Sequence, residues 1–347
     1  MNDPVRQPSA HAVVTGGAGF LGRHLCRSLA RDGIRVTAVD NLCTAAPDAP
    51  DDLAVTGTRL VRADVADPRW YRNIGDTPPD IIFHLACPAS PRDYRRLAID
   101  TLEACAVGTR NVLECARSCG PRVVIASTSE VYGDPVEHPQ HEQYRGNVDP
   151  VGPRSVYDEG KRYAEALARA YRDRHGADVS IARIFNTYGP GMRPDDGRMI
   201  PTFLSQALAG EPLTVAGTGE QTRSLCYVDD LVDGLRALAD LGCFGPVNLG
   251  NPEEITVAEV AAHVCACTGH PGRTVHVAAA EDDPQRRCPD ISKARRLLGW
   301  SPRVTLDDGL LRTVRAWPET PVRHSETSAN ASDKSRGAPA FGPSPSG

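Results

Sequence analysis

The fold of this chain is constrained most by a glycine-rich turn between a strand and a helix near its start. Residues 12–15 (Ala-Val-Val-Thr) form a short apolar run that predicts a buried strand. Gly16 to Gly22 follow with the pattern Gly-x-x-Gly-x-x-Gly, and a helix is expected at about 23–31. A second strand, 35–39, ends at Asp40. This order of elements predicts the first half of a dinucleotide-binding α/β unit.

Each glycine of the turn has a distinct role in such a unit. Gly16 permits the tight turn, Gly19 lets the backbone approach a pyrophosphate, and Gly22 lets the helix pack closely on the strand. The N-terminus of the helix offers free N–H groups to the phosphates. Asp40 suits the ribose hydroxyls and would repel a 2′-phosphate, so NAD is favoured over NADP. The alternative is a glycine-rich turn without a ligand.

Further apolar runs continue the alternation of strands and helices. Strands are expected at 60–65, 81–86, 123–127 and 179–185, and a helix at about 108–118. Two more runs, 227–232 and 246–250, predict returns to the same sheet. The fold class is therefore α/β, a Rossmann-type doubly wound parallel sheet with a smaller, mostly C-terminal substrate domain.

The regular pattern breaks after about residue 188, which sets the predicted domain limits. The NAD-binding domain is expected to span 11–187 plus about 225–250, and the substrate domain about 188–224 plus 251–316. Residues 1–10 and 318–347 lack an apolar period and are expected to be disordered tails.

A cluster of reactive side chains is expected beyond the strand at 123–127. Thr128 could hydrogen-bond a substrate hydroxyl, and Glu130 could act as an acid or base. Tyr157 and Lys161 lie one turn apart on a predicted helix, so they share a face. A lysine ammonium beside a phenol favours the phenolate, which makes Tyr157 a candidate general base. The alternative is a surface pair on an amphipathic helix.

Composition excludes several classes of partner. The net charge of −5 gives no basic excess to favour nucleic acid or an anionic membrane. The eleven cysteines show no Cys-x-x-Cys pair, and Pro139 makes His138-Pro-Gln-His141 a poor metal signal, so no metal is expected. No signal peptide or membrane-spanning run is evident. Scattered cysteines are typical of a reducing cytosol, and a cytoplasmic location is expected.

Longer motifs resemble the extended short-chain dehydrogenase/reductase enzymes that act on nucleotide sugars. The resemblance runs from about Val13 to Leu311 and is most similar to the UDP-glucuronate decarboxylases. The motifs that carry it are His84 to Pro91, Ser127 to Pro135, Gly152 to Arg162, Ala182 to Pro190, Gln221 to Asp230 and Asp282 to Ile291.

The resemblance implies NAD as a bound catalyst, UDP-glucuronate as the substrate and a homodimer. It implies that Tyr157, with Lys161, takes the proton of the sugar 4-hydroxyl, which Thr128 orients. Decarboxylation and reprotonation would then involve Ser129, Glu130 and Arg287. The 4,6-dehydratases carry an aspartate in place of Ser129, where a carboxylate would repel that of glucuronate. Substrate contacts are implied for Arg154, Asn186, Arg198, Arg223 and Arg287, and cofactor contacts for Gly16, Gly19, Phe20, Leu21, Gly22, Asp40, Asn41, Thr44, Asp64, Val65, Leu85, Ala126, Tyr157 and Lys161.

Two departures from the family pattern leave substrate choice open. Glu103-Ala104-Cys105 stands where the family usually has Lys-Thr-Asn, and Pro190-Gly191-Met192 where it usually has Pro-Arg-Met. The alternatives are another NAD-dependent nucleotide-sugar enzyme, such as a 4-epimerase or a 4,6-dehydratase, and a non-catalytic NAD-binding protein.

Overall fold

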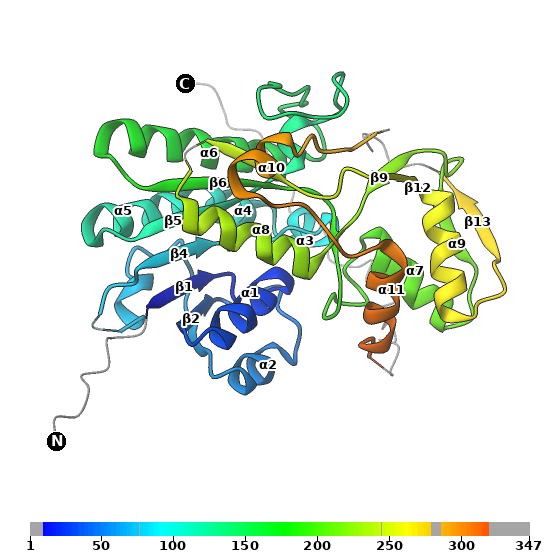
Figure 1. Cartoon of the computed structure of the whole chain (residues 1–347), viewed down its shortest axis with the longest axis horizontal. Coiled ribbons are helices and arrows are strands. Elements are labelled where there is room, and N and C mark those ends of the chain that lie inside the picture. Colours follow the sequence, from blue (N-terminus) through cyan, green and yellow to red (C-terminus); the bar gives the residue numbers. More distant parts are fainter. Residues whose placement is uncertain (1–9, 76, 244, 279–285, 319–347) are drawn as a thin grey trace, which may run out of the picture.

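A parallel sheet forms the centre of the molecule. The computed structural model describes residues 10–75, 77–243, 245–278 and 286–318. Within these ranges, seven strands lie in the order β11-β6-β5-β4-β1-β2-β3, and every neighbouring pair is parallel (Figure 1). Their bounds are β1 His11–Thr15, β2 Arg35–Asp40, β3 Arg59–Arg62, β4 Ile81–His84, β5 Arg122–Thr128, β6 Val179–Ile184 and β11 Pro246–Leu249.

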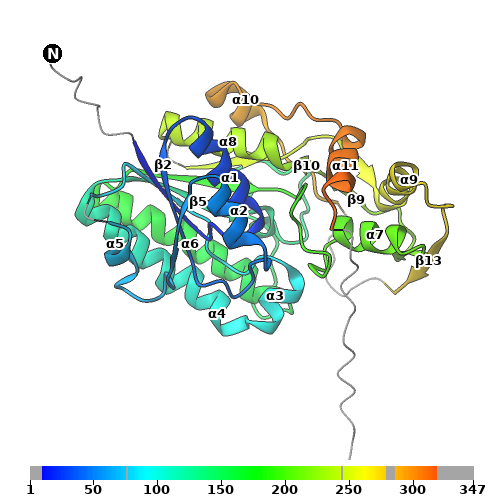
Figure 2. The same cartoon turned by 90° about the horizontal axis from the view of Figure 1, so that it is seen from below.

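Helices cover both faces of this sheet, as the predicted fold class requires. Helices α1 and α8 lie on one face, and α4, α5 and α6 lie on the other (Figure 2). Neighbouring residues of one strand pack into different cores, since Val14 joins the α1–α8 side and Val13 the α5–α6 side. The helix bounds are α1 Phe20–Arg31, α2 Ala49–Val55, α3 Pro91–Arg96, α4 Ala98–Glu103, α5 Thr109–Cys119, α6 Ser155–His175 and α8 Val228–Leu241.

Three short helical turns and two short strands complete this half of the chain. A π-helix, Ala104–Gly108, joins α4 to α5. Two 3₁₀ turns span Trp70–Asn73 and Ser129–Tyr132, and the second follows β5 directly. Outside the main sheet, β7 (Thr187–Tyr188) pairs with β10 (Cys226–Tyr227).

The prediction of a strand at 227–232 is wrong. Tyr227 ends the short strand β10, and α8 begins at Val228. The buried positions Val228, Leu231 and Leu235 recur at helical spacing along α8. A run of six residues is too short for its periodicity to separate a buried strand from the start of a buried helix. The companion prediction at 246–250 is confirmed by β11, which pairs with β6.

A second group of elements lies beside the carboxyl end of the sheet (Figure 1). Strand β13 pairs with β8 and β12 pairs with β9. Helix α7 packs on β8, α9 packs on β8 and β12, and α11 packs on α9. One helix in the range predicted for the substrate domain, α10, packs instead on α8 and β11. The bounds are α7 Met199–Leu208, β8 Leu213–Ala216, β9 Thr222–Ser224, β12 Glu254–Thr256, α9 Val257–Thr268, β13 Thr274–Val277, α10 Ser292–Leu298 and α11 Leu306–Arg315.

The predicted tails lie outside the described residues, apart from Ala10 and Pro318, which are both exposed. Among the helices in the described part of the chain, none has the length and apolar character needed to cross a membrane.

Candidate active site

The glycine turn has the geometry of a phosphate-binding loop. Gly16 has φ +72°, and a Cβ there would lie 2.7 Å from the backbone nitrogen of Ala86. A Cβ on Gly22 would collide with the Gly16 carbonyl, so the helix can approach the strand only with glycine at this position. Helix α1 begins at Phe20, earlier than expected, because Gly19 is its extended N-cap. The free N–H groups of the first turn therefore lie at the turn itself.

Asp40 braces this loop from the end of β2. Its carboxylate accepts hydrogen bonds from the N–H of Ala18 at 3.0 Å and of Leu42 at 2.8 Å. Asp64, at the end of the neighbouring strand region, accepts a hydrogen bond from the Asn41 amide at 2.9 Å. Two carboxylates close to the loop give this end of the site a negative charge, which fits ribose hydroxyls and disfavours an additional phosphate.

One cavity of about 680 Å³ extends from the glycine turn to the second group of elements. Every site residue predicted from the sequence lines it, and a cradle of glycine backbone at one end fits a dinucleotide such as NAD. The lining includes Gly16, Gly19, Phe20, Leu21, Gly22, Asp40, Asn41, Thr44, Asp64, Val65, Leu85, Ala126, Thr128, Ser129, Glu130, Arg154, Tyr157, Lys161, Asn186, Arg198, Arg223 and Arg287.

Tyr157 and Lys161 lie in the first turns of α6 and are both buried. The Lys161 ammonium donates a hydrogen bond to the Ala126 carbonyl at 2.8 Å and lies 5.8 Å from the centre of the Tyr157 ring. The Tyr157 ring stacks on Tyr94, with the ring centres 5.2 Å apart. Burial raises the pKa of Tyr157, and Lys161 opposes that rise without overcoming it. The expected lowering by lysine is therefore one contribution to a pKa that is higher than that of an exposed phenol.

Thr128 and Glu130 occupy the end of β5 and the turn that follows it. The Thr128 hydroxyl accepts a hydrogen bond from the Glu130 N–H at 3.2 Å, which fixes the turn. Ser129, between them, is also buried. Because β5 lies in the middle of a parallel sheet, its carboxyl end places these groups in the cavity, beside the Tyr157 hydroxyl.

Two arginines converge on the Glu130 carboxylate. Arg287 donates two hydrogen bonds to the two Glu130 carboxylate oxygens, and the longer of them measures 2.9 Å. Arg154, the N-cap residue of α6, donates another to Glu130. Burial would raise the pKa of Glu130, but Arg287 and Arg154 outweigh it, so the pKa is below its usual range. Glu130 is therefore held as a carboxylate and is ill suited to act as a general acid.

Asp158 lies next to this cluster and changes its charge with pH. The sequence analysis did not identify this residue. Its carboxyl lies 4.0 Å from the Arg154 guanidinium. Burial, with Glu130 nearby, raises the pKa of Asp158 to about 7. At neutral pH the group therefore combines two guanidinium ions, one firmly ionised carboxylate and one carboxyl that is about half protonated. The net charge is positive, which favours an anionic ligand group.

Two of the three remaining predicted substrate residues reach the cavity from the second group of elements, and one reaches it from the main sheet. Arg223 lies on β9 and donates a hydrogen bond to the Thr222 carbonyl at 2.8 Å. Arg198 precedes α7 and makes a bidentate ion pair with Asp196, at 2.5 and 2.8 Å. Asn186 follows β6 and lines the same cavity. Their roles toward a ligand stay predictions.

Comparisons with known proteins place the chain in a family. Residues 12–250 match the family described as "NAD dependent epimerase/dehydratase family". The chain belongs to this family. It is 48% identical over 303 residues to UDP-glucuronic acid decarboxylase 1 of Xenopus tropicalis, covering 87% of this chain and 70% of that protein. It is 46% identical over 311 residues to UDP-glucuronic acid decarboxylase 6 of Arabidopsis thaliana, covering 89% of each.

Solved structures support the same family placement. UDP-glucose 4-epimerase from Thermotoga maritima, solved with UDP-glucose, matches with a TM-score of 0.82 and 27% identity, covering 88% of this chain and 98% of that one. UDP-glucuronic acid 4-epimerase from Bacillus cereus, in complex with UDP-glucuronic acid and NAD, matches with a TM-score of 0.76 and 25% identity over the same shares. The predicted fold class, family resemblance and NAD dependence are thereby confirmed.

Arg193 is a further residue of the cavity wall that the sequence analysis did not single out. Its guanidinium donates hydrogen bonds to the Thr44 carbonyl at 2.7 Å and to the Asp93 carboxylate at 2.8 Å. Arg193 therefore connects the segment before α7 to the cofactor-binding side of the cavity. The only signal in the sequence was its place in the dense Pro, Gly and Arg stretch after β7.

Gly191, a departure from the family pattern, has a local structural reason. Its φ is +82°, which favours glycine, and its carbonyl accepts a hydrogen bond from Arg23 at 2.8 Å. A Cβ at Gly191 would lie 3.0 Å from the same guanidinium. Arg23 of α1 therefore occupies the space that a side chain at position 191 would need.

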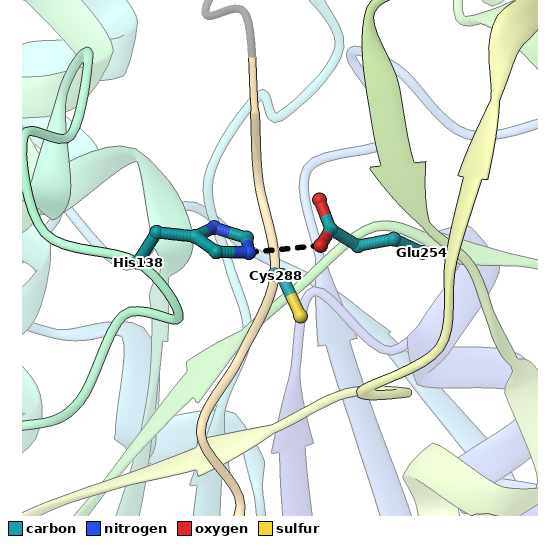
Figure 3. A group of neighbouring side chains, drawn as sticks. All are labelled: His138, Glu254 and Cys288. Carbon is teal, nitrogen blue, oxygen red and sulfur yellow. Dashed lines mark ion pairs between the residues drawn. The ribbon is translucent and has the colours of Figure 1, made fainter.

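Within the described residues, one group of side chains has the spacing of metal ligands. His138, Glu254 and Cys288 point toward one another (Figure 3), with ligand atoms all within 4.8 Å. The Arg286 guanidinium lies 2.7 Å from His138 Nε2 and 3.1 Å from a Glu254 oxygen. Because the Arg286 guanidinium already neutralises the Glu254 carboxylate, we keep the prediction that no metal binds here.

Proposed function

We propose that this protein converts UDP-glucuronate to UDP-xylose and CO₂, with NAD as a bound catalyst. The observation that carries the proposal is the cationic cluster of Arg154, Arg287 and Glu130, placed beside Tyr157 and Lys161 in one cavity. Such a cluster suits a sugar whose carboxylate is attached to the carbon beside the one to be oxidised. The identity of 45–48% to UDP-glucuronic acid decarboxylases supports the same substrate.

Oxidation at C4 begins with the hydroxyl groups of the site. The glycine turn and Asp40 would hold a bound NAD, which would supply reversible hydride transfer at the sugar C4. Tyr157 takes the proton of the 4-hydroxyl, and Thr128 orients that hydroxyl. The Lys161 ammonium stabilises the phenolate that Tyr157 must form, because both side chains are buried and a nearby positive charge favours an ionised phenol.

Decarboxylation then follows from the chemistry of the oxidised sugar. A ketone at C4 makes the C6 carboxylate a β-keto acid, and its loss as CO₂ leaves electrons on the C4 oxygen. Arg287 and Arg154 would hold the carboxylate, since guanidinium binds it bidentately and does not lose its proton. Ser129 would relay the proton that C5 must receive, and Glu130, kept ionised by both arginines, would hold their guanidinium groups in place.

We extend the proposal to assembly and location. Ile99 is 69% exposed and Leu102 38% exposed on α4, and Tyr163 is 50% exposed on the adjacent α6. Two packed helices with exposed apolar side chains suit a homodimer in which each copy contributes the same pair. Eleven free cysteines are consistent with a reducing compartment, which supports a cytoplasmic location.

The assembly is tested by light scattering on the purified protein. Ile99→Glu should reduce the molar mass from that of a dimer to that of a monomer. Val55→Glu, at an apolar residue that is 88% exposed on α2, is the matched control and should leave the dimer intact. A monomeric wild-type protein would contradict the proposed assembly.

The activity is tested by incubating the protein with UDP-glucuronate and no added reductant. Mass spectrometry should show a UDP-pentose and an equal amount of CO₂, and Tyr157→Phe should form both on the order of 10²–10⁴ times more slowly. A product that keeps its carboxylate would identify a 4-epimerase, the alternative that the Bacillus cereus structure favours because it binds the same sugar. No turnover of any UDP-sugar would support the non-catalytic alternative.

A further inference from the structure

Two cysteines touch each other at the wall of the active-site cavity. Cys87 follows β4 and lines the cavity, and Cys105 is buried in the π-helix between α4 and α5. Their sulfur atoms are 3.4 Å apart, although the residues come from separate elements. Cys105 is also one of the residues that depart from the usual family pattern, so the pair is a feature of this chain's own sequence.

The surroundings of the pair favour a thiolate. The hydrogen bond from the Cys87 thiol, together with the smaller effect of the Lys161 ammonium, lowers the pKa of Cys105 to about 7 despite its burial. The pair therefore loses one proton near neutral pH and shares the remaining one across the sulfur–sulfur contact. The same hydrogen bond and burial raise the pKa of Cys87, so the proton lies mainly on Cys87. Transfer of that proton to Cys105 puts the thiolate on Cys87, which lines the cavity, where a small oxidant can reach it.

We propose that Cys87 and Cys105 form a reversible disulfide that switches off the adjacent active site. The Cys87 thiolate attacks a hydroperoxide, an S–O bond forms and the O–O bond breaks, which gives a sulfenic acid. The hydroxide, or the alkoxide from an organic peroxide, takes a proton from solvent and leaves as water or alcohol. The Cys105 thiolate then attacks the Cys87 sulfur, the S–S bond forms, and the S–O bond breaks to release hydroxide. The proton lost by Cys105 converts that hydroxide to water. Two thiols are oxidised and one peroxide is reduced.

Closing the bond must move the walls of the site. The sulfur atoms have to approach from 3.4 Å to about 2.05 Å. Cys105 packs directly against α6, since a Cβ on Gly160, between Tyr157 and Lys161, would meet the Cys105 sulfur at 3.2 Å. On the other side, Ala86 packs on Gly16 of the phosphate-binding turn. A shift of either cysteine is therefore passed to the catalytic helix or to the cofactor loop.

The test begins with the full-length wild-type protein, reduced and then exposed to hydrogen peroxide. After alkylation, a non-reducing tryptic digest should contain peptide 73–92 joined to peptide 97–110, because each holds only one of the two cysteines. Turnover of UDP-glucuronate should fall on the order of 10²-fold, as for a ~1 Å misplacement of reacting groups. It should fall in step with the linked peptide and return with dithiothreitol.

Three single substitutions separate this disulfide from other oxidation. Each variant is compared with its own reduced activity. Cys105→Ser should keep its turnover in peroxide, whereas Cys119→Ser, at an exposed cysteine on α5, should be inactivated like wild type. Cys43→Ser should also be inactivated like wild type, although Cys43 is exposed and lines the cavity. A resistant Cys43 variant, or wild-type inactivation without the linked peptide, would overturn the proposal.

The digest also keeps this inference separate from the proposed function, on which only the turnover readout rests. A protein that forms the linked peptide but never acts on UDP-glucuronate would contradict the proposed function and not the disulfide. For such a protein, a change in NAD affinity on oxidation would replace turnover as the readout. An active protein without the linked peptide, or a linked protein with unchanged turnover, would overturn the switch alone.

Discussion

Replacing Arg287 by glutamine should uncouple the oxidation of the sugar from the loss of CO₂. Arg287 is 6% exposed, and its guanidinium grips the Glu130 carboxylate with two N–H groups. A hydrogen bond to a charged group contributes about 1.5–3 kcal/mol. If two such bonds hold the substrate carboxylate as CO₂ leaves, their loss raises the barrier to decarboxylation by ~3 kcal/mol. The rate of that step then falls about 10²-fold.

The assay separates the two chemical stages in a single turnover. NADH absorbance reports the oxidised sugar, and quenched samples report UDP-xylose. In Arg287→Gln the absorbance should rise and persist while UDP-xylose forms about 10²-fold more slowly. Arg286→Gln is the matched control, since that neighbour is more exposed and contacts Glu254 instead of Glu130. Equal loss of both stages, or a wild-type rate of UDP-xylose formation, would refute the role of Arg287.

Three further predictions follow from the site. Tyr157→Phe should lower turnover by on the order of 10²–10⁴ while leaving NAD binding, measured by calorimetry, unchanged; near-normal turnover would place the base elsewhere. NAD should bind at least about tenfold tighter than NADP, because the Asp40 carboxylate at the end of β2 would repel a 2′-phosphate, and the reverse order in the same titration would contradict that role. A folded-state pKa of about 7 for Asp158, against an ordinary 3.8, means that the folded protein binds this proton more tightly, so its stability falls as pH rises from about 4 to 7. Relative to Asp158→Asn, urea unfolding of the wild type should lose on the order of 4 kcal/mol across that window, and parallel curves would show that Asp158 does not titrate there.

Local patterns made the cofactor half of the molecule predictable. The glycine turn and Asp40 follow each other within one strand, helix and strand, so their spacing alone places them together. Tyr157 and Lys161 share a helix face for the same reason. Both predictions depend on the period of a single element, which the sequence specifies directly.

The charge cluster could not be predicted in the same way, because it depends on contacts between distant segments. Glu130 and Arg287 are 157 residues apart, and only the packing of the second group of elements brings them together. The raised pKa of Asp158 follows from burial, which no residue spacing reveals. The contact between Cys87 and Cys105 also depends on how the π-helix packs against the end of β4.

The central claim is that one site oxidises C4, releases CO₂ and returns the same hydride. UDP-glucuronate labelled with deuterium at C4 and with ¹³C at C6 tests it most directly. We expect UDP-xylose that keeps its deuterium, together with an equal amount of labelled CO₂ and no NADH released to solution. A product that retains the ¹³C carboxylate, or UDP-xylose that has lost its deuterium, would contradict it.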